Sequence, residues 1–357
     1  MRVLCDHQIF SSFAYSGISR YFCELFTEFN DLGVQWNVSC FFSNNKFLKS
    51  LKHYPGFLPE QNFRGKNRIL ENINLVKTRC ALAQGDFDIF HSTYSKPYDR
   101  KLLKGKPYII TVHDLTHEKY GAKLPSGLRE TAEEKESIAR ADGIICPSFA
   151  TRDDLLTFYP EAAEKTTVIY HGVRIPDVPE GCFAESRPYF LYVGSRMFYK
   201  DFPTAVRAVA MLPAEYRLFC VGGGSFTAAE KELFAHLGMT DRVLHKQLSE
   251  PELFAAYRNA AALIFPSEAE GFGLPVIEAQ SQGCIPVLSD TPCFREIGSD
   301  KALYFPLHDA GACAEQLKSV LNGTPVAEVQ QNLNRFNWRT AAGQTLGFYR
   351  KFFDQLI

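Results

Sequence analysis

The sequence predicts an α/β protein with two doubly wound domains. Short apolar runs, each suited to one buried strand, alternate with amphipathic stretches along the 357 residues. This alternation is typical of βα units in parallel sheets. Because a chain of this length exceeds the usual size of a single hydrophobic core, we expect two domains.

The apolar runs form two series separated by a segment rich in proline, glycine and acidic residues. The first series predicts strands at 2–5, 34–42, 87–91, 107–112, 142–146 and 167–170. The second predicts strands at 189–193, 216–221, 242–245, 261–265, 284–289 and 302–305. Since the intervening Arg174–Gly181 suits a linker, we predict two domains that face each other across a cleft, a linker between them and a terminal segment. These are an N-terminal domain over 1–173, a linker over 174–187 and a C-terminal domain over 188–335, with a terminal segment over 336–357.

Composition excludes several classes of protein. A net charge of -1 and a pI near 6.8 argue against a general nucleic-acid binder. The N-terminus resembles a strand opening rather than a secretory signal, and no apolar run reaches the length of a membrane span. Ten scattered cysteines show no metal-ligand spacing, so we expect reduced, buried thiols in a cytoplasmic protein.

The most informative stretch is Pro266–Glu278, which follows the apolar run 261–265. It contains glycines and then Pro275, a residue favoured at the first helical position, so the loop should end at a helix N-terminus. Unpaired amides and the helix dipole at such an end favour a diphosphate. The amides in question belong to Phe272, Gly273 and Leu274.

Two carboxylates bracket this loop. Glu270 lies before the helix and Glu278 on its first turn. Carboxylates accept hydrogen bonds from vicinal hydroxyls, so the pair can contact different parts of one extended sugar nucleotide. Taken singly, each would be read as a solvated acid, but the combination of strand, glycines, proline and paired acids favours a binding site.

These glutamates are separated by seven residues, the signature of the retaining, nucleotide-sugar-dependent glycosyltransferases of family 4. The chain resembles this family over nearly its whole length, and further similar segments are Tyr192–Lys200, Phe219–Gly224, Ser249–Leu253 and Ile169–Val173. The resemblance implies the GT-B architecture of two Rossmann-like domains. It also implies that the helix after Trp338, within 336–357, crosses back to the first domain.

The resemblance also assigns roles in the C-terminal half. Beyond Gly194, Arg196 and Lys200 would grip the donor diphosphate. A catalytic role also makes sense without the family, because fixed cations that stabilise a leaving diphosphate usually contribute much of the catalysis. The alternative is that Arg196 and Lys200 are an ordinary solvent-exposed pair at the start of a helix. Glu270 would position the hydroxyls of the donor sugar, and Glu278 would bind the ribose. The base would be read around Gly223, Val243 and Leu244.

In the N-terminal half, the run 108–112 places His113 at a strand end. The resemblance implies that His113 is the active-site histidine that touches the transferred sugar. Gly17 occupies the position of the family's Gly-Gly loop, but Ser16 replaces the other glycine, which weakens the expectation of close backbone contact. His91, at another strand end, is a weaker candidate.

The expected reaction is transfer of a hexosyl group to a saccharide or lipid-linked acceptor, with retention. No carboxylate stands as an obvious nucleophile, so a front-face route is favoured. The segments 6–10 and 15–22 most resemble bacterial mannosyltransferases of surface-polysaccharide assembly, which favours GDP-mannose as donor. No Asp-x-Asp pair appears in the loops expected to face the cleft, so we expect neither a metal nor a cofactor. A UDP-sugar donor, a nucleotide-sugar epimerase and an inactive sugar-binding module are the alternatives. A dinucleotide-dependent oxidoreductase is disfavoured, since the glycine pattern is absent after the first strand.

The region from Lys46 to Lys106 is basic, because it contains thirteen Lys and Arg but only five Asp and Glu. Its first part, 45–52, interleaves bases with apolar residues. This pattern suits peripheral contact with an anionic membrane or a lipid diphosphate, and a basic surface without a special partner explains it about as well.

Overall fold

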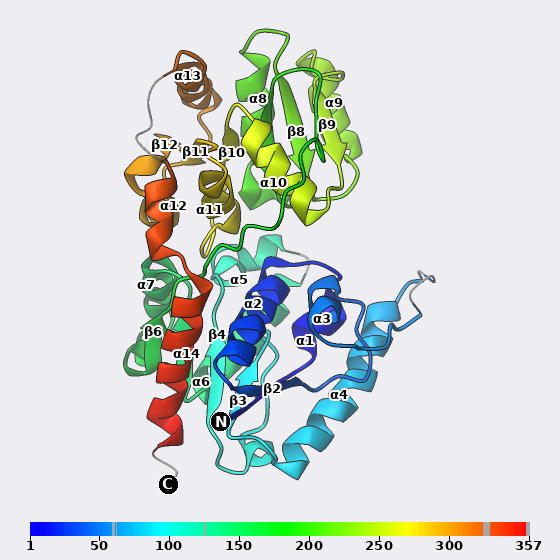
Figure 1. Cartoon of the computed structure of the whole chain (residues 1–357), viewed down its shortest axis with the longest axis vertical. Helices are drawn as coiled ribbons and strands as arrows, with labels where there is room; N and C mark the ends of the chain where they lie inside the picture. The colour runs from blue at the N-terminus through cyan, green and yellow to red at the C-terminus, as the bar shows by residue number, and fades with distance from the viewer. Residues whose placement is uncertain (59–60, 62, 125, 324–328, 355–357) are drawn as a thin grey trace. The chain divides into compact units, whose positions relative to one another are not determined.

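The chain folds into two compact α/β units in a computed structural model that describes residues 1–58, 61, 63–124, 126–323 and 329–354 (Figure 1). The first unit comprises Met1–Gly172 together with Trp338–Ile357, and the second comprises Val173–Asn337. The sequence-based division had placed the corresponding limits at residues 173 and 335.

In the described part of the first unit, six strands form one parallel sheet in the order β2-β1-β3-β4-β5-β6. Apolar side chains from its strands and covering helices form a continuous core that includes Phe90, Ile110 and Ile144. The strands are β1 (Arg2–Cys5), β2 (Gln35–Val38), β3 (Ile89–Ser92), β4 (Tyr108–Thr111), β5 (Gly143–Cys146) and β6 (Thr166–Val168). The helices are α1 (Gln8–Ser12), α2 (Gly17–Asp31), α3 (Lys46–Leu51), α4 (Lys66–Gln84), α5 (Thr116–Tyr120), α6 (Gly127–Arg140), α7 (Phe149–Phe158) and α14 (Trp338–Phe353).

The described residues of the second unit also form a six-stranded parallel sheet, in the order β12-β11-β10-β7-β8-β9. The strands are β7 (Tyr189–Val193), β8 (Arg217–Val221), β9 (Val243–Lys246), β10 (Leu263–Phe265), β11 (Pro286–Ser289) and β12 (Leu303–Phe305). The helices are α8 (Phe202–Ala210), α9 (Ala228–His236), α10 (Glu250–Asn259), α11 (Leu274–Ser281), α12 (Pro292–Gly298) and α13 (Ala310–Leu321). The strand order reverses between β7 and β10, which is where ligands bind in sheets of this kind.

The prediction of two doubly wound domains is confirmed, because every predicted strand has an observed counterpart. The largest difference is β2, which ends at Val38 rather than at residue 42. The amides of Phe41 and Phe42 turn instead to the side-chain oxygen of Asn74 on α4, at 2.8 and 3.2 Å. A side-chain acceptor has therefore replaced a strand partner, and the apolar pattern alone does not show this.

The terminal helix α14 belongs to the first unit, as the family resemblance implies. The Tyr349 hydroxyl lies 2.6 Å from Nδ1 of His91, whose Nε2 is 2.9 Å from Thr111 Oγ1. Trp338 stacks on His171, with ring centroids 5.6 Å apart. His91 is thus fully used in holding the helix, and burial lowers its pKa to about 3, so we assign it a structural role.

Gly143 on β5 leaves room for α14. A Cβ atom at this position would lie 2.8 Å from ring atoms of both Phe348 and Phe352. We expect Gly143→Ala to lower the free energy of unfolding of the first unit by about 1–3 kcal/mol, because overpacking displaces the helix. Thermal unfolding checks this. The control is Gly343→Ala on α14, where a Cβ meets nothing and the melting temperature should stay or rise. An unchanged melting temperature for Gly143→Ala would contradict the packing.

Candidate functional site

The strand-order reversal of the second unit brings together two loops. The loop after β7 carries Arg196 and Lys200, and the loop after β10 carries Glu270. The amide of Glu268 donates to the carbonyl of Tyr199 at 2.8 Å, which ties the two loops to each other. Predicted site residues that are far apart in the sequence therefore share one edge of this sheet.

Lys200 and Glu270 form an ion pair at this edge. Lys200 Nζ donates to Glu270 Oε1 at 2.5 Å, and the two side chains are only 15% and 13% exposed. The ammonium also lies 5.2 Å from the ring centre of Tyr199 and 5.9 Å from that of Phe265. The pair fixes a cation and a carboxylate side by side at the place where the fold binds ligands.

Arg196 holds the glycine turn that follows β8. Its Nε donates to Glu230 at 2.6 Å, and its terminal nitrogens donate to the carbonyls of Gly222, Gly224 and Ser225 at 2.8–3.1 Å. The side chain is only 4% exposed and its guanidinium lies 4.8 Å from the ring centre of Phe226. In this structure the donors of Arg196 serve the protein itself, and its direct contact with a donor diphosphate stays a prediction.

The turn that Arg196 holds requires glycine. Gly223 has a φ of +74°, and a Cβ there would lie 2.6 Å from Nη1 of Arg196. Gly194, with φ +129°, donates its amide to Val221 at 2.9 Å and brings its carbonyl against the same turn. The two predicted glycines thus belong to one backbone arrangement. Glu230 on α9 supports it by accepting the hydrogen bond of Arg196 Nε.

Glu278 lies on the first turns of α11, as predicted, and is 4% exposed. The Tyr257 hydroxyl on α10 donates to its Oε2 at 2.9 Å. A buried carboxylate oriented by a phenol is well defined in position. The structure thus gives Glu278 a fixed orientation, while its role toward a ribose stays a prediction.

The loop before α11 has the backbone that the sequence predicts. Gly273 is the N-cap with φ +84°, so the helix has no N-cap side chain to accept hydrogen bonds from its first-turn amides. A Cβ at Gly273 would meet the Phe294 ring at 3.1 Å. Phe272 is buried against Phe336, and Leu274 begins the helix. Helix α2 differs, because its Ser16 hydroxyl caps the Ser19 amide at 3.0 Å.

Two predicted residues have other surroundings. Val243 is the first residue of β9, is 5% exposed and packs in the core of the second unit. Val243 therefore starts the strand, and its role in base recognition stays a prediction. Gly17 opens α2, as predicted, but the serine before it forms a reciprocal capping box with Ser19. That cap satisfies a first-turn amide that a ligand would otherwise use.

His113 follows β4 in the first unit. Its ring contacts that of Tyr21 edge-on, with centroids 5.2 Å apart, and its buried Nε2 has no hydrogen-bond partner among the described residues. Burial lowers the pKa of His113 to about 4, so the imidazole is neutral at neutral pH. Asp114 is instead used at the start of α5, where its Oδ1 accepts from the Thr116 amide at 2.9 Å.

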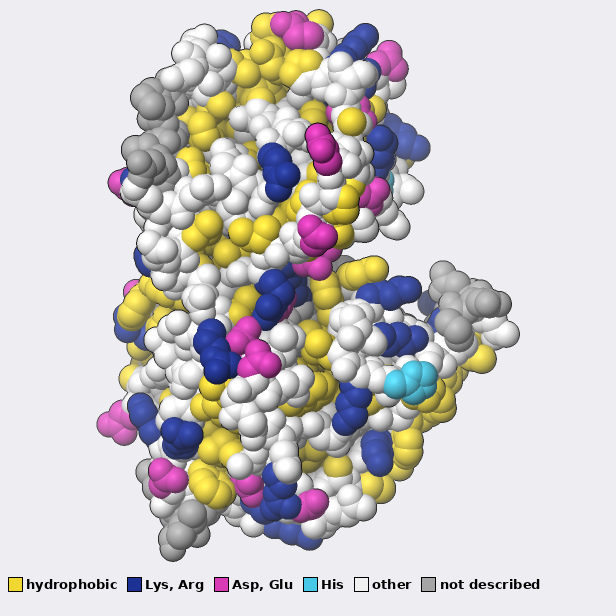
Figure 2. Space-filling model, in the orientation of Figure 1, with side chains coloured by type: hydrophobic (Ala, Val, Ile, Leu, Met, Phe, Trp, Pro, Cys, Tyr) yellow, Lys and Arg dark blue, Asp and Glu magenta, His cyan; other side chains and the backbone are white. Residues whose placement is uncertain are grey.

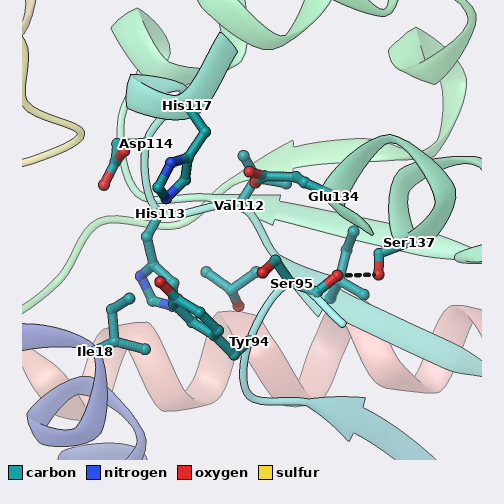
Figure 3. Close-up of a pocket in the computed structure, with 11 residues that line it drawn as sticks. Ile18, Tyr94, Ser95, Val112, His113, Asp114, His117, Glu134 and Ser137 are labelled. Carbon is teal, nitrogen blue, oxygen red and sulfur yellow. Dashed lines mark hydrogen bonds between the residues drawn. The ribbon is translucent and has the colours of Figure 1, made fainter. Parts of the chain in front are cut away.

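A pocket lies beside His113 within the first unit (Figure 3). Its polar lining includes Ser95, His117, Glu134 and Ser137, none of which the sequence analysis singled out. Glu134 was overlooked because α6 carries several acids of similar appearance. A usable signal existed, since Glu134, Ser137 and Ile138 recur at helical spacing on its buried face.

The basic region contributes a second cavity of the first unit. Lys46 and Lys49 on α3 line it with Lys66, whose ammonium donates to the carbonyls of Leu58 and Gln61. Figure 2 shows Lys and Arg side chains gathered beside hydrophobic ones over α3 and α4. Among the described residues, no helix is both long and apolar enough to span a bilayer.

Comparison with known families matches almost the whole chain. The family model described as "Glycosyltransferase Family 4" matches residues 15–175, and that described as "Glycosyl transferases group 1" matches residues 177–336.

Curated relatives include the O-antigen chain mannosyltransferase RfbU of Salmonella typhimurium, 28% identical over 231 residues. That alignment covers 64% of this chain and 63% of RfbU, less than two thirds of the relative. A D-inositol 3-phosphate glycosyltransferase of Xylanimonas cellulosilytica is 26% identical over 310 residues, covering 77% of this chain and 74% of that protein.

Solved structures with the same fold include the sucrose-phosphate synthase of Thermosynechococcus elongatus. It superposes with a TM-score of 0.77 at 20% identity, covering 99% of this chain and 100% of that one. Anabaena Alr3699/HepE in complex with UDP and glucose gives 0.71 at 17% identity, covering 97% and 98%.

The His117–Glu130 ion pair near the pocket predicts a pH effect. Nε2 of His117 lies 2.7 Å from Glu130, which raises the pKa of His117 above 6.5 and lowers that of Glu130 below 4.5. The pair therefore stabilises fully between these two pH values. Its contribution is lost as pH rises through the raised pKa of His117 or falls through the lowered pKa of Glu130. An NMR titration should give His117 a pKa above 6.5 that drops in Glu130→Gln, and an equal pKa in both proteins would contradict the pair.

The contacts of Arg196 with Glu230 and the turn 222–225 predict that a substitution of Arg196 destabilises the protein even in the absence of ligand. We expect Arg196→Lys to lower the free energy of unfolding of the second unit by about 1–3 kcal/mol, because a lysine keeps the charge but its single nitrogen cannot reach Glu230 and the three carbonyls together. Thermal unfolding of the nucleotide-free protein measures this. The matched control is Arg207→Lys on the exposed face of α8, which should be neutral. A variant as stable as wild type that binds nucleotide more weakly would instead make Arg196 a direct phosphate ligand.

Proposed function

The chain belongs to the family 4, or group 1, glycosyltransferases, and from this we propose that it moves a hexose, mannose favoured, from a nucleoside diphosphate sugar to a saccharide or lipid-linked acceptor. The likeness to an O-antigen chain mannosyltransferase supports the choice of mannose and a role in surface-polysaccharide assembly. GDP-mannose is accordingly the favoured donor.

The observation that carries the proposal is the Lys200–Glu270 pair at the strand-order reversal. A donor diphosphate beside Lys200 would gain negative charge as its bond to the sugar breaks. A cation that is already fixed in a largely buried site stabilises that charge, because neither the side chain nor water has to reorganise. Glu270, held at 2.5 Å from the ammonium, keeps acceptor capacity for sugar hydroxyls on its remaining lone pairs.

Arg196 serves the same reaction through the backbone. By holding the turn 222–225 with its guanidinium, it fixes the loop after β8 next to the loop after β7. Donor phosphates would then meet backbone amides of this turn and of the start of α11, while Glu278 binds the ribose. Such preorganised dipoles are worth more in a dry site than in water.

We further propose that the reaction proceeds with retention and without a metal ion. Glu270 is paired with Lys200 and Glu278 with Tyr257, so neither carboxylate is set apart as a nucleophile. In a front-face route the departing phosphate takes the proton of the acceptor hydroxyl. His113, neutral at neutral pH, would hydrogen-bond the transferred sugar rather than repel a developing positive charge. Proton NMR of the product linkage tests retention. Activity measured in excess chelator tests whether the reaction requires a metal ion.

Two narrower alternatives remain to be separated by experiment. A UDP-sugar donor would leave every described contact unchanged, since none of them reads a base. A nucleotide-sugar epimerase of this fold would act on the donor alone. Calorimetry with GDP, UDP and ADP identifies the nucleotide, and product analysis with donor but no acceptor reveals epimerisation. Peripheral membrane contact through the basic region likewise stays a prediction, which co-sedimentation with anionic vesicles at low salt would check.

The ion pair gives a direct test of the proposed function. We expect Lys200→Met to lower kcat/KM for the donor by about 10²–10³-fold, because the fixed positive charge is lost from the transition state. The matched control is Lys318→Met on α13, which removes a lysine that also pairs with a glutamate, Glu315 at 2.7 Å, and should leave kcat/KM unchanged. Equal activities for the two variants would refute the role of Lys200.

A further inference from the structure

The pocket beside His113 collects polar atoms that have no partner. Ser95 Oγ, His113 Nε2 and His117 Nδ1 are buried without a hydrogen bond to any described residue, and all three residues line it. Buried polar groups are normally paired, so several orphan groups in one pocket indicate a missing ligand or ordered water. The pocket thus offers donors and acceptors that the protein itself leaves unused.

Glu134 is the strongest of these signals. It exposes 9% of its surface, lines the pocket and makes no hydrogen bond or ion pair with the described part of the chain. Its carboxyl reaches from α6 to the pocket side near Val112, while Asp114 points away from it (Figure 3). Leaving a carboxyl buried and unpaired is costly unless something outside the chain satisfies it.

Burial and the neighbouring carboxyl groups affect the protonation state of Glu134. Burial is the main cause that raises its pKa well above the usual value, and Glu118, Asp114 and Glu130 raise it further. Glu130 is paired with His117, and Glu118 accepts from the Tyr159 hydroxyl at 3.0 Å. Both effects favour the protonated form of Glu134, and a protonated carboxyl both donates and accepts a hydrogen bond.

The residues around Glu134 also indicate which class of ligand the pocket can bind. Three neighbouring carboxyl groups disfavour a phosphate, and no set of three metal-ligating side chains occurs among the described residues. The remaining lining includes the apolar or aromatic residues Ile18, Tyr94, Ile110 and Val112, together with Thr111 and Asp114. A mixture of apolar surface and hydrogen-bonding groups matches an uncharged sugar ring, which has both an apolar face and hydroxyls.

We propose that this pocket holds an uncharged sugar ring of the acceptor, and that Glu134 is the residue that selects it through a hydrogen bond to one of its hydroxyls. The inference rests on the proposed function, because only a glycosyl transfer requires an acceptor sugar. It adds to that function a substrate class, namely neutral rather than phosphorylated acceptors at this subsite, and a specificity residue outside the signature motifs.

Glycoside binding without donor tests the proposal. Saturation-transfer NMR on the full chain would use methyl α-mannoside, α-glucoside and α-galactoside, together with the corresponding hexose phosphates. We expect at least one methyl glycoside to bind and the phosphates not to compete. Glu134→Ala should weaken that binding about tenfold, the equivalent of one hydrogen bond, whereas Glu134→Gln, a neutral isostere, should stay within about threefold.

Controls separate binding from folding. Glu136→Ala, two positions along α6 with a half-exposed side chain, should bind as wild type. Glu134→Ala should melt no lower than wild type, because it removes an unpaired buried acid, and Ser95→Ala should also weaken binding. In turnover, Glu134→Ala should raise KM for the acceptor more than it lowers kcat.

Three results would overturn the proposal: no methyl glycoside binds the wild type, the phosphates bind better, or Glu134→Ala binds as wild type. Failure of the proposed function would look different, because it would show as absent nucleotide binding in calorimetry while these glycoside measurements still gave an answer.

Discussion

Parallel strand direction is the constraint on which the site in each unit depends. When all strands of a sheet run the same way, every loop that follows a strand emerges at one edge, and helices cover both faces. Lys200 follows β7 and Glu270 follows β10, seventy residues later, yet the reversal of strand order makes these two strands neighbours. The ion pair is a product of this topology. In the first unit the same rule brings Ser95, after β3, and His113, after β4, to one pocket.

The two sites treat charge in opposite ways. In the site of the second unit, Lys200 pairs with Glu270 and Arg196 with Glu230, both within 2.6 Å, and both pairs are largely shielded from water. Such pairs are costly to break, so they hold their loops in place before any ligand arrives. In the first unit, burial lowers the pKa of His113 and raises that of Glu134, which favours the neutral form of both. One site is thus suited to a charged group, and the other to hydroxyls.

Much of the fold followed from the sequence, because apolar runs of strand length occur wherever a strand is observed, and Pro275 marked the start of α11. The paired glutamates and His113 were singled out for the same reason, since motif and strand end coincide, and their roles stay predictions. Side-chain partners could not be predicted. Arg196 contacts carbonyls of a turn some 26 residues away, which no local pattern reveals. The burial of Val243 in the core at the start of β9 likewise depends on residues from other elements.

The discontinuity of the first unit has a consequence for biosynthesis. Helix α14 supplies Tyr349 to His91 and Trp338 to His171, so two buried imidazoles stay without these partners until this helix is made. The nascent N-terminal half therefore emerges from the ribosome with an unfinished core, and it must wait through synthesis of the entire second unit before it closes. A truncation that spares every candidate active-site residue but removes this helix would consequently leave a chain that exposes aromatic surface and invites chaperones or aggregation.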